Sequence, residues 1–256
     1  MSDFDRNVVS ARSGYRADRV AIDAGLRTYM IRVYNYMAAG VALTGVLSWL
    51  TYQAAGGDAI QVHGNRIAGL TAFGQTVYSP VGSIVLLLGT LGLVFFISFR
   101  VNRLQPSTAL ALFMVYAGLL GVMLSSIFLT YTGTSITRVF FISGASFGAL
   151  SLYGYTTQRD LSPIGSFLIM GLFGLLLAML VQMFLQSPGL SFVISVIGVL
   201  IFAGLTAWDT QRIKEMYDVH DDGTVAGRKA VMGALSLYLD FINLFLFLLR
   251  LMGDRR

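Results

Sequence analysis

The stretch Ala230–Met252 reads AVMGALSLYLDFINLFLFLLRLM, and it carries one carboxylate, Asp240, among residues that otherwise belong in hydrocarbon. An ionised carboxylate in the middle of a membrane costs about 3 kcal/mol or more, so such a residue faces a bundle interior, water or a charged partner. Helical spacing places Gly233, Ser236 and Asn243 on the face of Asp240, and leucines cover the other faces. We therefore expect the rest of the chain to form a wall around this helix.

The composition is that of a membrane protein. Of 256 residues, 55% are hydrophobic and 12% are charged, and the mean hydropathy is +0.71. A water-soluble domain shows far more polar surface, so we predict an all-α, polytopic, single-domain membrane protein whose main partner is the lipid bilayer. Without cysteine the chain has no disulfide or thiolate metal site. The net charge of +5 reflects arginines in loops, so no nucleic-acid partner is expected.

Seven apolar stretches have the length of transmembrane helices, each near the ~20 residues that cross a bilayer. They cover residues 30–53, 80–99, 107–130, 135–156, 163–186, 189–210 and 230–252. Residues 1–28 are polar and mixed in charge, which predicts a cytosolic tail, with a short interfacial helix as one option. Residues 29–256 then form the seven-helix membrane domain.

Prolines and glycines mark where the helices begin and where they pack. Each proline lies at a span start beside a serine that is expected to cap the first turn. These pairs are Ser79 with Pro80, Ser107 with Pro106, Ser162 with Pro163, and Ser187 with Pro188. Paired glycines at 118 and 121, and at 144 and 148, predict close approach of neighbouring helices.

The distribution of lysine and arginine predicts the orientation. Six of these residues occur up to Arg32, and further ones follow the second, fourth and sixth spans. Because basic residues collect on the cytoplasmic side, the N-terminus is predicted to be cytosolic. Seven crossings then leave Arg250, Arg255 and Arg256 outside. Either the last helix crosses against this rule, or it re-enters and leaves the C-terminus inside.

Two acids lie within or at the end of a span, Asp209 and Asp240. A helix that enters from the cytosol near Ala230 carries Asp240 about 15 Å along its axis, where a tilt or close crossing brings it to Asp209. Two adjacent carboxylates do not both ionise cheaply, so they share a proton and titrate as a pair, which makes them a pH sensor. Together with carbonyls and Asn243 they also suit calcium. Alternatively, Asp240 bonds a neighbouring helix and Asp209 caps its span.

Three further features have a functional and a plain interpretation. Arg100 ends the second span on the cytosolic side, where it either neutralises the aspartate pair or anchors the helix at the interface. His63, in the long outer loop 54–79, is either a ligand or a solvated side chain. The first six positions of the acidic loop 218–223 have the spacing of an EF-hand calcium loop. Lys229 occupies the twelfth position, where an EF-hand requires a glutamate, so we expect no EF-hand.

The sequence gives little support for an enzyme. Both lysines, Lys214 and Lys229, lie in one loop and offer no attachment point for retinal within a span. No HExxH motif, phosphate loop or nucleophile elbow occurs. An intramembrane aspartyl protease also uses two aspartates, but in a GxGD setting, whereas Asp240 lies in SLYLDFIN. We therefore expect neither catalysis nor a cofactor.

Three segments carry a family resemblance: SLYLDFINLFLFLLRLMG (236–253), YMIRVYNYMAAGVALTG (29–45) and FGALSLYGYTTQRDLS (147–162). They resemble bacterial members of the Bax inhibitor-1 family, also called the transmembrane Bax inhibitor motif family. The resemblance implies six helices around a central seventh, and a pH-sensitive calcium leak. It transfers a two-aspartate sensor to Asp209 and Asp240 and a gate-locking arginine to Arg100, with Arg103 close by. An acid that precedes this arginine in some members has no counterpart here.

The resulting prediction is a multi-pass inner-membrane protein that leaks calcium passively. Protonation of Asp209 and Asp240 gates it, Arg100 locks it, and Ser236 and Asn243 line the pore. The two aspartates are also the expected metal ligands, with calcium and protons as the interacting ions. The alternative is a non-conducting regulator that binds a membrane protease or another membrane partner through its tail and loops.

Overall fold

The computed structural model describes residues 3–63 and 66–256, and the side chains of residues 24–61, 67–101 and 103–256. Its helices are α1 (Asp3–Ala55), α2 (Ala72–Val77), α3 (Pro80–Arg100), α4 (Pro106–Leu124), α5 (Ile127–Thr130), α6 (Gly133–Thr156), α7 (Ser162–Leu185), α8 (Pro188–Glu215) and α9 (Gly223–Met252). The short strands β1 (Gln61–His63) and β2 (Arg66–Ala68) form an antiparallel hairpin. Turns of 3₁₀ helix cover Gly57–Ala59 and Val101–Arg103.

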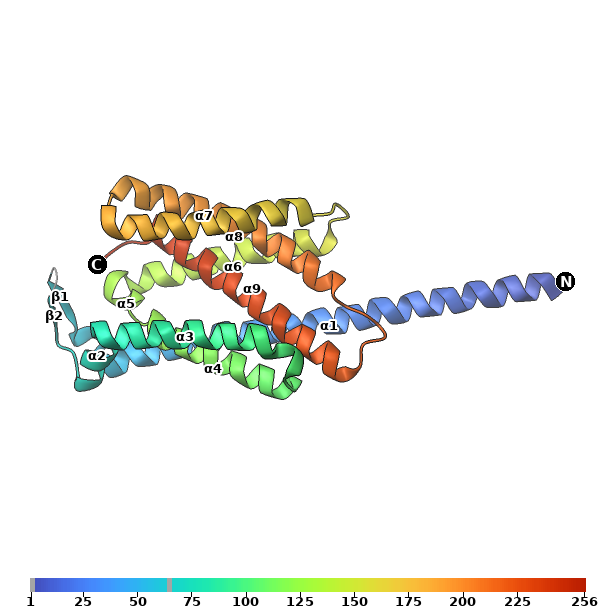
Figure 1. Ribbon diagram of the computed structural model, residues 1–256, viewed down its shortest axis with the longest axis horizontal. Coiled ribbons are helices and arrows are strands. Elements are labelled where there is room, and N and C mark those ends of the chain that lie inside the picture. The colour runs from blue at the N-terminus through green and yellow to red at the C-terminus, as the bar shows by residue number, and fades with distance from the viewer. Residues whose placement is uncertain (1–2, 64–65) are drawn as a thin grey trace.

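Seven segments of this described chain are long and apolar enough to span a membrane. They are Ala24–Ala55, Pro80–Arg100, Pro106–Thr130, Gly133–Thr156, Ser162–Leu185, Pro188–Glu215 and Gly223–Met252. The expected fold class is confirmed, and each span lies where its apolar stretch predicts it. The residues expected as a tail continue the first span as one helix, and α1 projects beyond the bundle (Figure 1).

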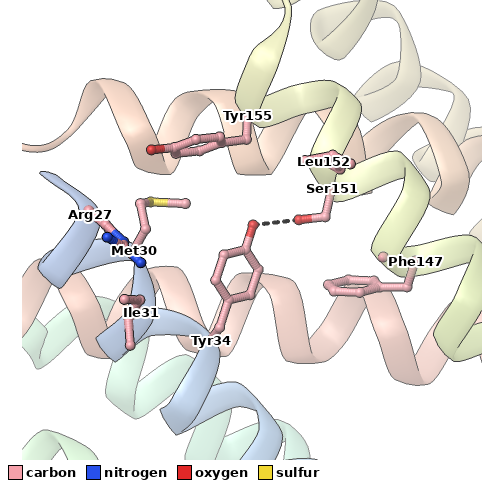
Figure 2. Close-up of a pocket in the computed structure, with 9 residues that line it drawn as sticks. Arg27, Met30, Ile31, Tyr34, Phe147, Ser151, Leu152 and Tyr155 are labelled. Atoms are coloured by element: carbon pink, nitrogen blue, oxygen red, sulfur yellow. Dashed lines mark hydrogen bonds between the residues drawn. The ribbon is translucent and has the colours of Figure 1, made fainter. Parts of the chain in front are cut away.

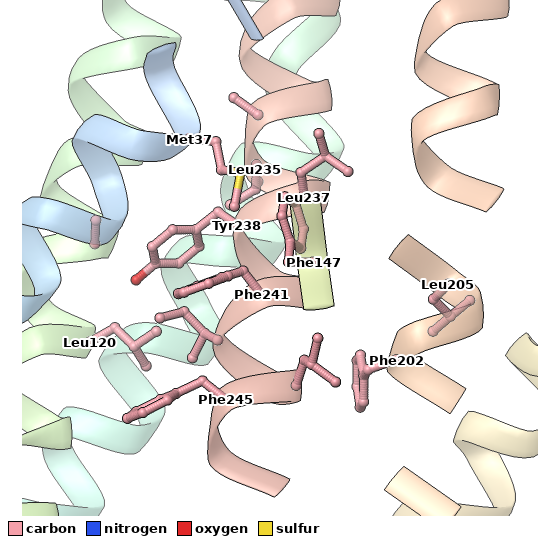
Figure 3. Packing of buried hydrophobic residues seen from close by; sticks show 14 of the residues in the cluster. Met37, Leu120, Phe147, Phe202, Leu205, Leu235, Leu237, Tyr238, Phe241 and Phe245 are labelled. Atoms are coloured by element: carbon pink, nitrogen blue, oxygen red, sulfur yellow. The ribbon is translucent and has the colours of Figure 1, made fainter. Parts of the chain in front are cut away.

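The helices form two layers with α9 between them (Figure 1). One layer contains α1, α3 and α4, the other contains α6, α7 and α8, and α9 packs against α1, α4, α6 and α8. In the most apolar segment of α9, 72% of the residues are buried. The corresponding share is 11% in both α3 and α7. Figure 3 shows Tyr238, Phe241 and Phe245 of α9 packed into this core. The central position of the last helix is therefore confirmed.

The capping prediction is right for two of the four serines. Ser79 accepts a hydrogen bond from the Gly82 amide, and Ser187 accepts one from the Leu190 amide. The prediction is wrong for Ser107 and Ser162, because both lie inside the first turn of their helices. At α7 the exposed Asp160 accepts from the Ser162 amide instead, and this hydrogen bond lowers the pKa of the Asp160 carboxyl.

The glycine prediction is also half right. A side chain at Gly121 would meet the Thr44 carbonyl oxygen of α1 at 2.7 Å, so α1 and α4 pack closely there. Gly144 and Gly148 on α6 instead face open space, where nothing lies within 4 Å of an added Cβ. The close approach on α6 occurs at Gly154, which lies against the Ala207 backbone of α8.

The C-terminus lies at the end of the bundle opposite the start of α1 (Figure 1). Arg138 of α6 forms an ion pair of 2.9 Å with Asp254. The Asp254 carbonyl accepts from the Thr132 amide at 3.1 Å, and the Arg256 amide donates to the Thr130 carbonyl at 3.0 Å. Helix α9 runs from one end of the bundle to the other (Figure 1), as the full crossing among the two alternatives requires.

Candidate functional site

Asp240 lies in the middle of α9 among residues that are fully packed. Its exposed fraction is 5%, and its neighbours Tyr238 and Phe241 are buried as well. Its Oδ2 atom is buried without a hydrogen-bond donor among the described residues. An acceptor left in this state destabilises the folded protein, so Asp240 needs a proton or a donor from an adjacent group.

Asp209 of α8 is that adjacent group. Helices α8 and α9 approach closely at Gly233 of α9, which has no side chain. A Cβ atom added at Gly233 would lie 3.0 Å from the Ile213 side chain of α8. The carboxyl groups of Asp209 and Asp240 are neighbours across the contact between α8 and α9. Two neighbouring carboxylates that are both ionised repel each other. The structure thus places the two predicted aspartates on adjacent helices.

A cavity of about 210 Å³ reaches Asp209 from the end of the bundle where α9 begins. Its lining comprises Val101, Asp209, Arg212, Ile213, Met216, Met232, Gly233 and Ser236. Ser236, predicted to line a pore, therefore shares a cavity wall with Asp209. Asn243 does not belong to this lining, because its Nδ2 donates to the Leu239 carbonyl of its own helix at 2.8 Å.

The cation beside the pair is Arg212. Its guanidinium lies 3.9 Å from Asp209 Oδ1, one helical turn further along α8. Arg100 is exposed at the end of α3 and forms no ion pair with any acid whose side chain is described, and Arg103 is exposed too. The expected contact of Arg100 with the aspartates is thus not present. The i, i+3 spacing of Asp209 and Arg212 is the sequence signal that identifies the observed partner.

The described side chains contain no group of three or more histidines and acids that could hold a metal ion. The site offers calcium two carboxyl groups and, at the cavity wall, the Ser236 hydroxyl. These are hard oxygen ligands, but they are too few for a closed calcium site without water.

The acidic loop before α9 has structural contacts. Asp222 caps α9 by accepting from the Val225 amide at 2.7 Å, and Asp218 accepts from the His220 amide at 2.9 Å. Asp221 forms an ion pair with Lys229 at 2.5 Å. The side chain of His63, the other candidate ligand, lies outside the described residues.

A chain of hydroxyl groups joins three helices that sequence reasoning left unconnected. Thr210 of α8 donates to the Thr206 carbonyl at 2.7 Å and lies 2.9 Å from the Ser151 hydroxyl of α6. Ser151 in turn lies 2.6 Å from the Tyr34 hydroxyl of α1. Residues 117 positions apart make this contact, so no local pattern reveals it.

The chain is similar to a known protein family and to several bacterial proteins. The family model described as "Inhibitor of apoptosis-promoting Bax1" matches residues 26–256. An uncharacterized protein of Rickettsia prowazekii is 48% identical over 91% of this chain and 92% of its own length. One from Caulobacter vibrioides is 42% identical over 100% of both chains. The Escherichia coli inner membrane protein YbhL is 43% identical over 91% of this chain and 94% of its own.

Proposed function

The chain belongs to the Bax inhibitor-1 family, and on that premise we propose that this multi-pass membrane protein conducts a passive calcium leak gated by protonation of Asp209 and Asp240. The proposal is supported by the position of two acids, Asp209 and Asp240, on adjacent helices inside the membrane-spanning bundle, where Asp209 lines a cavity. Intramembrane acids that face a cavity are typical of ion and proton pathways. Neither a cofactor nor catalytic turnover is part of the proposal.

The packing supports interpreting this structure as the closed state. The cavity is lined by Asp209 but not by Asp240, and beyond Asp240 aromatic rings pack against helix α9. Phe241 contacts Phe147 edge-on, and Phe247 stacks on Phe202. An ion that leaves the cavity therefore needs α9 to move. Gain or loss of a proton at the pair changes the contact that holds α9 against α8.

Arg212 takes the place expected for Arg100 in this closed state. It faces Asp209 at 3.9 Å, with 59% of its own side chain exposed. A cation in this position offsets the negative charge of an ionised Asp209 and is exposed enough to move away. We propose that Arg212 stabilises the closed state. Arg100 would reach the aspartates only after the helices rearrange.

We further propose that the protein lies in the inner membrane with its N-terminus in the cytosol. The relative from Escherichia coli is named an inner membrane protein. The end of the bundle at which α9 begins contains Arg159, Arg212, Lys214, Arg228 and Lys229. This accumulation of basic residues is typical of a cytoplasmic surface.

The test is calcium entry into liposomes that contain the purified protein and an internal calcium dye, over a series of pH values. We expect a flux that varies with pH in the wild type and a flat pH profile for Asp240→Asn. Asp254→Asn makes the same chemical change at an exposed acid of the far end, so its pH profile should match the wild type. If Asp240→Asn keeps the wild-type profile, the pair is no sensor.

The alternative is a non-conducting regulator that binds a membrane protease or another membrane protein. Its support is the N-terminal part of α1, which projects beyond the bundle and offers a helix to a partner (Figure 1). The liposome experiment separates the two functions. Folded protein without flux at any pH contradicts the leak and leaves the regulator, whose activity should depend on residues 1–28.

A further inference from the structure

A second cavity, of about 570 Å³, opens between α1 and α6 at the side of the bundle (Figure 2). These helices belong to different layers, and α9 packs against both of them. Its volume lies in the usual range of ligand pockets, about 300–1,000 Å³. It shares no lining residue with the cavity beside Asp209.

The lining is polar at one end and apolar at the other. Figure 2 shows Arg27 and the Tyr155 hydroxyl at one end and Phe147 at the other. Arg27 is the one charged residue of this lining, and no acid belongs to it. An occupant that complements this surface combines a negatively charged group with a hydrocarbon chain.

The depth of these residues matches that of a lipid. Arg27 lies three residues from the start of the first span at Ala24, the level at which headgroups occur. Tyr34 lies seven residues further along α1, about 10 Å deeper at 1.5 Å per residue. Ile31 is 49% exposed and Leu152 is 63% exposed, so the apolar part of the cavity is open towards the surrounding hydrocarbon.

The hydroxyl groups of Tyr34 and Ser151, in the wall beside the apolar end, are already paired. Thr210 donates to a backbone carbonyl, so Ser151 donates to Thr210, and the Tyr34 hydroxyl donates to Ser151. A hydrocarbon chain that lies against Tyr34 and Ser151 therefore leaves no donor without a partner. If these hydroxyl donors had no partners, covering them with a hydrocarbon chain would be unfavourable.

We propose that this cavity binds one anionic phospholipid of the surrounding bilayer. The lipid phosphate accepts hydrogen bonds from the Arg27 guanidinium and the Tyr155 hydroxyl. One acyl chain packs along Met30, Ile31, Phe147 and Leu152. The site is independent of the calcium leak, because none of the groups invoked belongs to the aspartate pair.

The test uses the full chain in phosphatidylcholine nanodiscs that contain a small fraction of phosphatidylglycerol with a photoreactive acyl chain. Adducts are mapped by mass spectrometry. We expect adducts at Ile31 and Leu152 to exceed those at Phe173 and Leu177 of α7, which are also largely exposed. A phosphatidylcholine probe should label both groups of residues alike. Equal labelling of both groups by the phosphatidylglycerol probe would overturn the proposal.

Two variants test the headgroup contact. Arg27→Gln should lower labelling of the cavity by phosphatidylglycerol about fivefold, the ratio for one basic residue near anionic lipid. Arg103→Gln removes an exposed arginine outside this lining, so its labelling should remain that of the wild type. An equal loss in both variants, or none in Arg27→Gln, contradicts a specific site.

Competition identifies the source of the negative charge. Unlabelled phosphatidylglycerol should displace the probe from the cavity at lower concentration than sodium oleate does. If oleate is the better competitor, the occupant is a free fatty acid, and the assignment of a phospholipid is wrong.

Discussion

At the scale of single residues, one hydroxyl joins three helices. Thr44 of α1 donates to the Ala117 carbonyl of α4 at 2.8 Å and accepts from the Tyr238 hydroxyl of α9 at 2.6 Å. All of these groups are buried, with Tyr238 at 0% exposed. Removing one partner of such a bond is costly because the other remains buried without a partner.

We expect Thr44→Val to destabilise the protein by about 1–2 kcal/mol. The substitution leaves the buried Tyr238 hydroxyl without an acceptor and the Ala117 carbonyl without the donor from Thr44. Tyr238→Phe should cost less, because Thr44 keeps its bond to Ala117. The measurement is unfolding of the purified protein in mixed micelles. Thr137→Val is the control, because exposed Thr137 bonds only the Gly133 carbonyl of its own helix. An equal loss for Thr44→Val and Thr137→Val contradicts this account.

At the scale of helices, close packing depends on which glycine faces a neighbour. Gly154 lies against the Ala207 backbone, which does not yield to an added methyl group, whereas Gly144 faces open space on the same helix. We expect Gly154→Ala to cost about 1–3 kcal/mol by forcing α6 away from α8. Gly144→Ala should be close to neutral in the same unfolding assay. A neutral Gly154→Ala would show that the two helices adjust without strain.

At the scale of the whole molecule, the two ends of α9 lie on opposite faces of the bundle, so they should lie on opposite sides of a membrane. The chain has no cysteine, which permits labelling of single introduced thiols. We expect Arg255→Cys to react with an impermeant maleimide in intact cells, and His220→Cys to react only after permeabilisation. The unmodified chain is the control. Labelling of both sites from the same side contradicts a seventh crossing, and the reverse pattern contradicts a cytosolic N-terminus.

Sequence reasoning predicted the spans and the two aspartates because those signals are local. A run of about 20 apolar residues follows from bilayer thickness, and a carboxylate within it is costly wherever it lies. Proline positions marked helix starts, but the serine that follows a proline is inside the helix, so Ser107 does not cap. The glycine spacing identified Gly121 correctly and Gly144 wrongly, because spacing shows which residues share a face but not what that face meets.

The sequence by itself thus determined the fold class, the number of spans, the family, and the presence of an acid on the last helix. Tertiary structure alone decided that Arg100 forms no ion pair with Asp209, that Tyr34 and Ser151 meet across two helices, and that a cavity opens between α1 and α6. The physical reason is that hydropathy depends on composition along one helix. Side-chain partners depend on how neighbouring helices rotate and cross, which is set by packing across the whole bundle.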